Sequence, residues 1–270
     1  MLAGFSLLSI APALAFIAPV TRTPEELIDN SDPYQATAIV TGYDMRSRPA
    51  GFAHCLREVL VKLSGEPRLE RDPRLSGLAA HADALVARFD YADLMAGIPV
   101  HDDQGTYDRP YDLVVRFDHA KIDGALASLG EKPWAGPRPQ VVPVLAVSGF
   151  GRHYLLSAEN KAAADQRGSL SVAAIKYGLA VHVPTEAELA ALGVIPDRPP
   201  NPAAEPAGDR ILVAGRLDFD EAKPGWTGSW RMRWRGVDYS WGISGVNYDA
   251  AFRAMLRGVL RVASGHGSPD

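Results

Sequence analysis

The chain has 270 residues, of which 47% are hydrophobic and 22% are charged. These are ordinary values for a globular protein, and the length is sufficient for one large domain or two small ones with real cores. The net charge of −4 lacks the strong basic excess of a dedicated nucleic-acid binder, so we expect no nucleic-acid partner. The single cysteine, Cys55, excludes an intrachain disulfide.

The N-terminal residues 1–20 are predicted to be a secretory signal peptide. No charged residue occurs between Leu2 and Val20, and the stretch contains Pro12 and the small-residue site Ala13–Ala15. A membrane anchor is the alternative, since the run is about long enough to span a bilayer. The proline and the A-x-A site favour cleavage, so we expect an exported, periplasmic protein without a transmembrane span. No cysteine stands directly after the segment, and a lipoprotein anchor is therefore not expected.

The first domain is predicted over residues 34–130, after a linker at 21–33. Apolar and polar residues alternate over 34–42, which predicts a strand. The next apolar residues recur at helical spacing, with Ser47 as N-cap and Gly65 as C-cap. Cys55 lies on the apolar face of this helix, so we expect a buried, inert thiol.

Three further elements complete the first domain. A second helix is expected from Asp72 to Phe89, with Gly77 weakening its middle, and then a loop over 91–107. The stretch 111–118 predicts a strand, after which Asp118 caps a short helix.

The segment 131–139, rich in proline and glycine, is the expected boundary to a second domain at 140–264, followed by a tail at 265–270. The expected elements are a buried strand at 140–149, helices at 157–166 and 169–177, a strand at 179–183, a helix with a capping box at Thr185 and Glu188, strands at 209–220, 227–235 and 237–243, and a last helix capped by Asn247. The order β-α-β-α-β-β-β-α and the first domain together predict an α+β fold with mixed layers.

No motif for a cofactor or a metal is present. None of the seven histidines stands at metal-binding spacing with another histidine or beside the cysteine. The stretch 100–112 gathers polar groups but lacks the spacing of a calcium loop, so it is interpreted as a solvated acidic turn. Its candidate groups are His101, Asp102, Asp103, Asp108 and Asp112.

The stretch Val147–His153 follows the buried strand but lacks the glycine pattern of a phosphate loop. Ser148 and His153 raise the idea of a nucleophile and a base, yet the G-x-S-x-G elbow is absent. A hydrolase therefore has only weak candidates, namely His101, Asp102, Asp103 and His153.

An aromatic and basic stretch at 226–241 holds four of the five tryptophans. With the period of two of a strand, its tryptophans fall on one face and its arginines on the other, so it does not form a stacking platform for bases or sugars. We expect a hairpin with a tryptophan core face. The basic row Arg231, Arg233 and Arg235 is a candidate surface for an anionic partner such as lipid headgroups.

Several stretches, taken in order, resemble an uncharacterised bacterial family, the domain of unknown function 2066. They are LREVLVKLSGEPRL at 56–69, DLVVRFD at 112–118, KPWAGPRPQVVPVLAV at 132–147 and ILVAGRLDF at 211–219. The resemblance implies an exported envelope protein and transfers no catalytic residue.

The leading expectation is a non-catalytic interaction or accessory protein of the cell envelope, whose partner is an envelope protein or an anionic surface. A hydrolase acting on an envelope substrate is the first alternative. The second is a small-ligand-binding protein with a pocket between the two halves, near Trp134. The sequence does not fix the oligomeric state.

Overall fold

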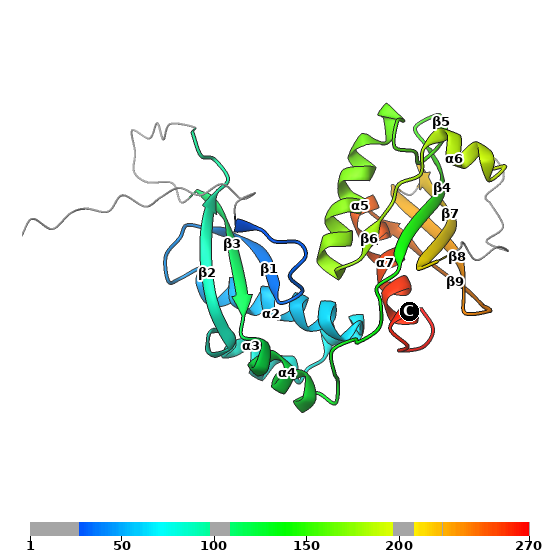
Figure 1. Ribbon diagram of the computed structural model, residues 1–270. Helices are drawn as coiled ribbons and strands as arrows, with labels where there is room; N and C mark the ends of the chain where they lie inside the picture. The colour runs from blue at the N-terminus through cyan, green and yellow to red at the C-terminus, as the bar shows by residue number, and fades with distance from the viewer. Residues whose placement is uncertain (1–26, 98–108, 197–207, 223, 270) are drawn as a thin grey trace, which may run out of the picture.

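The computed structural model describes residues 27–97, 109–196, 208–222 and 224–269 (Figure 1). The expected signal peptide, most of the acidic stretch 100–112 and most of the proline-rich segment 196–208 lie outside these residues. The described residues form two sheets, one of three strands and one of six, together with several helices. The fold is therefore α+β, as predicted.

The N-terminal half, which we define as residues 27–130, is an antiparallel sheet in the order β1-β3-β2 with helices against it. Its elements are β1 (Gln35–Thr41), α2 (Arg48–Ser64), the 3-10 turn η1 (Pro67–Arg71), α3 (Leu75–Ala80), the 3-10 turn η2 (Ala82–Leu85), β2 (Val86–Asp93), β3 (Pro110–Phe117) and α4 (His119–Ser128). The apolar side chains of β1 and β3 face α2, whose apolar stripe is fully buried.

The ends of the predicted helices agree with the structure, with one difference. Gly65 ends α2 in the left-handed region at a φ of 77°, and Asp118 caps α4 by accepting from the backbone N–H of Lys121. Ser47 precedes α2 but caps nothing with its side chain. Its backbone is already helical, and an N-cap side chain needs an extended backbone to reach the first turn.

The predicted helix from Asp72 to Phe89 is wrong. The segment breaks into α3 and η2, and from Val86 onward it is strand β2, which also shortens the predicted loop. Phe89 pairs with Val115 of β3, and its ring packs edge-on against Phe52 of α2 at a centroid distance of 5.3 Å. Aromatic and β-branched residues favour strands, and the pairing with β3 outweighs the helical spacing.

The C-terminal half, which we define as residues 140–269, is a six-stranded sheet whose main path is β5-β4-β7-β8-β9, with β6 beside β4. Its elements are β4 (Gln140–Gly149), β5 (Arg152–Leu155), the 3-10 turn η3 (Lys161–Ala163), α5 (Ala164–Tyr177), β6 (Ala180–Val181), α6 (Glu186–Ala191), β7 (Arg210–Asp220), β8 (Gly225–Trp234), β9 (Val237–Val246) and α7 (Tyr248–Ala263). Helices α5 and α7 pack together on the main core, whereas α6 belongs to a small second core with Val142 and Val144 of β4.

This order differs from the predicted one by one strand, β5, and by a single helix, α5, where two were predicted. Most of the predicted helix 157–166 is wrong, because residues 157–160 are not helical, 161–163 form η3 and α5 begins only at Ala164. The four residues of β5 pair with β4 through a two-residue turn at Phe150 and Gly151, both at positive φ. A four-residue edge strand carries too short a pattern to be recognised from the sequence.

The tryptophan strand β8 alternates as predicted. Trp226, Trp230 and Met232 are buried, while Thr227, Ser229 and Arg231 are exposed. Gly228 makes this face possible, because a Cβ there would stand 2.3 Å from the Trp230 ring. The face of β8 that carries the tryptophans therefore packs into the main hydrophobic core.

The two halves pack on each other through a shared apolar core and the contact between α2 and α5. The division into the domains 34–130 and 140–264 stays a prediction. Residues 265–269 turn back toward the N-terminal half, where His266 Nε2 lies 3.1 Å from Glu131 Oε2.

Candidate functional site

A groove runs along the free edge of β1, between the two halves of the molecule, with a volume of about 910 Å³. Its walls are β1, one face of α2 and the exposed side of α5. Figure 1 shows β1 and α5 on opposite sides of this space, with α2 beneath. We call it the β1-edge groove. It lies between the halves, as the small-ligand alternative expected, but Trp134 does not line it.

The register of β1 shows which backbone groups face the groove. At the two ends of the strand, Phe117 N–H donates to the carbonyl of Tyr34 and Gly42 N–H donates to the carbonyl of Arg109. In an antiparallel pair the hydrogen-bonded positions alternate, so the even-numbered residues of β1 bond to β3. The odd-numbered residues turn their N–H and C=O groups outward. Thr37, Ile39 and Thr41 have no backbone partner there among the described residues.

The end of this edge at Gln35 already has a partner. The Lys62 ammonium on α2 donates to the outward carbonyl of Gln35 at 2.8 Å. This bond confirms that odd-numbered carbonyls of β1 point toward α2 and the groove. The unfilled part of the edge therefore begins at Thr37.

The rim of the groove is apolar and exposed. Ile39 on β1 is 74% exposed, Val172 on α5 is 68% exposed and Ile175 on α5 is 43% exposed. All three line the β1-edge groove, so three of the large apolar side chains that the described residues leave in water gather at one place. Exposed apolar surface gathered beside polar groups marks a binding site more often than scattered residues do.

The floor is a polar stripe on α2, with His54, Glu58 and Lys62 one helical turn apart. Desolvation lowers the pKa of His54, helped by the positive charges of Lys176 and Arg57, which favours the neutral form of the imidazole. Desolvation also raises the pKa of Glu58 and lowers the pKa of Lys62, although the two side chains form an ion pair at 3.6 Å.

The charged side chains around the groove form ion pairs with oppositely charged neighbours. Besides the Glu58–Lys62 pair, Lys176 lies 3.1 Å from Glu70 and Asp29 lies 3.6 Å from Arg116. A ligand with a strong net charge would therefore find no free counter-charge on the walls of the groove. The chemistry favours an uncharged ligand that uses backbone-like hydrogen bonds and apolar side chains.

The predicted basic row does not form a uniform surface. Arg231 is exposed on the outer face of β8, whereas Arg233 forms an ion pair with Asp238 of β9 at 2.7 Å. Arg235 lies in the β8–β9 turn at a φ of 50°, with its guanidinium 5.5 Å from the centre of the Trp234 ring. Binding of an anionic partner by these residues stays a prediction.

Among the residues that the structure describes, the candidate catalytic groups do not assemble. His101, Asp102, Asp103 and Asp108 lie outside the described residues, and Asp112 lies on β3. Ser148 and His153 are direct cross-strand neighbours in the β4–β5 hairpin, yet no hydrogen bond joins their side chains and His153 is exposed. No third group orients the imidazole, as a nucleophile and base would require.

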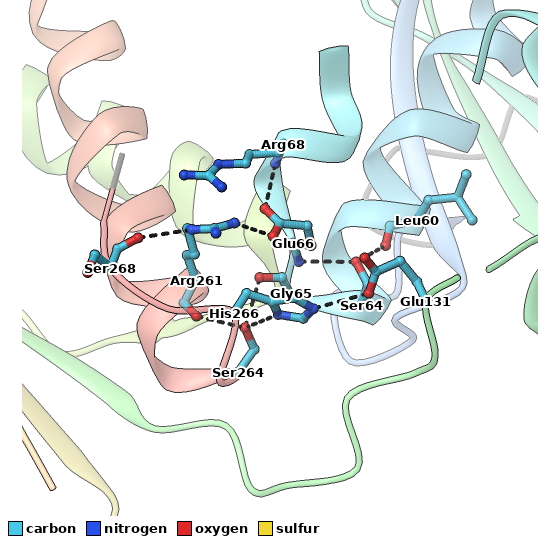
Figure 2. A network of polar contacts seen from close by, with 10 residues as sticks. All are labelled: Leu60, Ser64, Gly65, Glu66, Arg68, Glu131, Arg261, Ser264, His266 and Ser268. Atoms are coloured by element: carbon cyan, nitrogen blue, oxygen red, sulfur yellow. Dashed lines mark hydrogen bonds and ion pairs between the residues drawn. The ribbon is translucent and has the colours of Figure 1, made fainter. Parts of the chain in front are cut away.

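Figure 2 shows the polar network that joins the last helix to the N-terminal half. Arg261 forms a buried ion pair with Glu66, and its Nε donates to the carbonyl of Ser268 at 2.9 Å. The Ser264 hydroxyl lies 2.9 Å from the carbonyl of Gly65 and 2.9 Å from Nδ1 of His266.

The Ser264–His266–Glu131 chain looks like a catalytic triad, but its packing argues for a structural role. The hydroxyl of Ser264 lies within hydrogen-bond distance of two backbone carbonyls, those of Gly65 and Arg261. A Cβ on Gly65 would come within 2.4 Å of Ser264, so no substrate fits beside the hydroxyl on that side. We interpret the network as a joint between the halves.

Within the described ranges, no group of three or more histidine, cysteine or carboxylate side chains is placed to hold a metal ion. Over the same residues, no helix has the length and apolar character to cross a bilayer. Cys55 is fully buried, and burial raises the pKa of its thiol, which makes it unreactive as expected.

Residues 29–135 match the family model described as Domain of unknown function (DUF8605). This range holds β1 and α2, two of the three walls of the groove, and excludes α5. The resemblance to the domain of unknown function 2066 is thereby corrected, since the matching family is a different one. The stretches behind it were an amphipathic helix, short strands and a proline-rich link, which unrelated α+β proteins share. Neither the curated proteins nor the solved structures contain a match.

Proposed function

We propose that this protein is a peptide-binding interaction module, which takes an extended segment of a partner protein as an added strand on β1. The observation that carries the proposal is the row of outward N–H and C=O groups on Thr37, Ile39 and Thr41 inside an apolar-rimmed groove. Strand addition gives affinity through main-chain hydrogen bonds and specificity through alternate side chains.

The dimensions suit one strand. The seven residues of β1 offer about 23 Å of edge at roughly 3.3 Å per residue. Three outward residues supply up to six backbone hydrogen bonds, each contributing about 1 kcal/mol net. Ile39 would pack against β-branched or aromatic side chains of the added strand, the pairs that stabilise sheets best.

A flexible segment fits this site better than a second folded copy of the chain. The free edge of β1 faces α5 across the groove, so a neighbouring sheet cannot approach it broadside. A single extended segment can enter along the strand. Because the wall charges are paired, the segment would be uncharged over the part that contacts Thr37–Thr41.

The compartment belongs to the same proposal. The signal-like pattern at 1–20 supports export, so the partner would be an envelope protein of the periplasm. Expression of the full chain in a Gram-negative host, followed by N-terminal sequencing of the protein in the periplasmic fraction, tests this. An intact N-terminus in the cytoplasm contradicts export and leaves the groove proposal to be judged separately.

Binding is tested by fluorescence anisotropy with a labelled heptapeptide of alternating threonine and valine. The full chain is expected to bind it with a Kd on the order of 10–100 µM. The substitution Ile39→Pro removes an outward N–H and is expected to weaken binding about tenfold or more, whereas Ile39→Thr keeps the N–H and weakens it less.

The matched probes are two versions of the same peptide with N-methyl groups on alternate amides. One version carries them on the odd-numbered amides and the other on the even-numbered amides. Only one phase should lose binding, because only alternate amides of an added strand face β1. Equal binding of both methylated peptides, no binding of the parent peptide, or full binding by the Ile39→Pro variant would each overturn the proposal.

A further inference from the structure

A second pocket, separate from the β1-edge groove, lies at the β4–β5 hairpin between the N-terminal ends of α5 and α7. Its volume is about 450 Å³. Phe150, Trp226 and Tyr248 supply aromatic surface, and Arg152, Asp165 and Gln166 supply polar groups. We call it the aromatic pocket. It lies on the α5 and α7 side of the sheet, opposite to Ser148 and His153.

Phe150 is held in an unfavourable conformation to form this pocket. It occupies the first central position of a two-residue turn at a φ of 52°, where asparagine, aspartate or glycine is preferred. The residue is nevertheless 65% exposed, so burial does not compensate the backbone strain. An exposed aromatic ring kept in a strained turn indicates a role in binding.

The Phe150 ring belongs to an aromatic cluster, although the residue is largely exposed. One face stacks on Phe219 with centroids 4.3 Å apart, and Trp226 packs edge-on against Phe219 at 5.2 Å. Gly149 leaves the room for this arrangement, because a Cβ there would lie 2.8 Å from Phe219 and 3.3 Å from Trp226. The pocket therefore presents a preformed flat apolar surface.

The polar groups around that surface define the ligand. Arg152 offers donors, Asp165 offers acceptors, and Gln166 is buried with its amide oxygen bonded to the Tyr154 hydroxyl at 3.0 Å. Arg152 and Asp165 carry opposite charges, so the rim requires no net charge on a ligand. A neutral ring with an apolar face and several hydroxyls, each both donor and acceptor, matches this set.

We propose that the aromatic pocket binds a pyranose sugar, with its ring stacked on Phe150. The inference does not depend on peptide binding at β1, which lies in the other half of the molecule. The probes are chitotetraose and maltotetraose, titrated by isothermal calorimetry against the full chain. At least one is expected to bind with a Kd below about 10 mM.

The decisive variant is Phe150→Asn, which removes the platform and relieves the turn strain, because asparagine tolerates a positive φ. It should keep or raise the melting temperature and weaken sugar binding about tenfold. The matched control is Arg235→Asn at the same position of the β8–β9 turn, away from the pocket, which should leave binding unchanged.

Three outcomes overturn the inference. The first is that neither sugar binds at about 10 mM. The second is that the Phe150→Asn variant binds the sugar as tightly as the parent chain. The third is binding of free L-phenylalanine without binding of either sugar, which would assign the pocket to an aromatic amino acid held between Arg152 and Asp165.

Discussion

Proline substitutions at successive positions of β1 test which of its N–H groups face β3 and which face the groove. The binding proposal rests on this orientation. The N–H of Ala38 is expected to bond to β3, and Ala38 is 7% exposed. The substitution Ala38→Pro therefore loses a ladder bond worth about 1 kcal/mol and leaves a β3 carbonyl buried without a donor, at about 1–3 kcal/mol. With the ring clash, we expect a loss of about 3 kcal/mol in the free energy of unfolding.

The substitution Ile39→Pro moves the proline by one residue and should behave differently. The N–H of Ile39 faces the groove, and its side chain is 74% exposed, so no internal hydrogen bond and little packing are lost. We expect a cost of about 1 kcal/mol or less, since proline on the open side of an edge strand is tolerated. The difference between the two variants should reach about 2 kcal/mol.

Urea unfolding followed by circular dichroism measures both variants, with equal m-values as the condition for the comparison. Native-state hydrogen exchange gives an independent check, because the amides of Thr37, Ile39 and Thr41 should exchange much faster than those of Ala36 and Ala38. If Ile39→Pro destabilises the protein as much as Ala38→Pro, the outward row does not exist and the strand-addition proposal loses its basis.

Three further predictions concern the rest of the chain. Arg261→Met should cost about 3 kcal/mol, because it removes the guanidinium that pairs with the buried Glu66 carboxylate; urea unfolding should show that adding Glu66→Gln recovers part of the loss. Hydrogen bonds from the backbone N–H of Thr185, and after it from His182, lower the pKa of the Glu188 carboxyl to about 2. The stability that the ionised Glu188 contributes is therefore complete above the unfolded pKa near 4.5 and is lost as the pH falls through 2. An NMR titration of the Glu188 carboxyl carbon checks this, and a midpoint near 4.5 contradicts it. Arg231→Glu should change stability by less than about 0.5 kcal/mol, since the side chain is exposed, and a larger loss by urea unfolding would show that it has a structural partner.

Elements with a strong local pattern could be predicted from the sequence. Asn247 caps α7 by accepting from the backbone N–H of Ala250, and the apolar stripe from Phe252 onward is buried as the spacing requires. The alternation of β8 likewise depends only on the period of a strand, so the burial of Trp230 followed directly from it. In these elements local propensity and tertiary packing agree.

Strand β2 could not be predicted because two periodicities compete in one segment. Val86 and Phe89 stand three residues apart, as a helix requires, yet both pack on the core from a strand. What decides between them is pairing with β3, which lies more than 20 residues away in sequence. A single-segment pattern holds no information about such a partner.

The partial neutralisation of the basic row has a similar origin. The period of two of a strand predicts that Arg231, Arg233 and Arg235 lie on one face. It does not predict which residues lie opposite them across the hairpin. The turn sets the register that brings Asp238 opposite Arg233, and the same turn takes Arg235 out of the strand. A surface predicted from one strand is therefore incomplete until the register of its neighbour is known.

The two edges of the N-terminal sheet show why the groove is a property of the whole fold. The β2 edge carries a register shift between Val86 and Arg88 and charged residues at Arg88 and Asp90, devices that keep edges from pairing with other sheets. The β1 edge has no charge or proline at Thr37, Ile39 or Thr41. Its protection comes from α5, which stands across the groove and blocks the approach of another sheet. In the strand-addition proposal the same wall leaves the edge accessible to an extended segment, so one feature would both protect the edge and select the ligand.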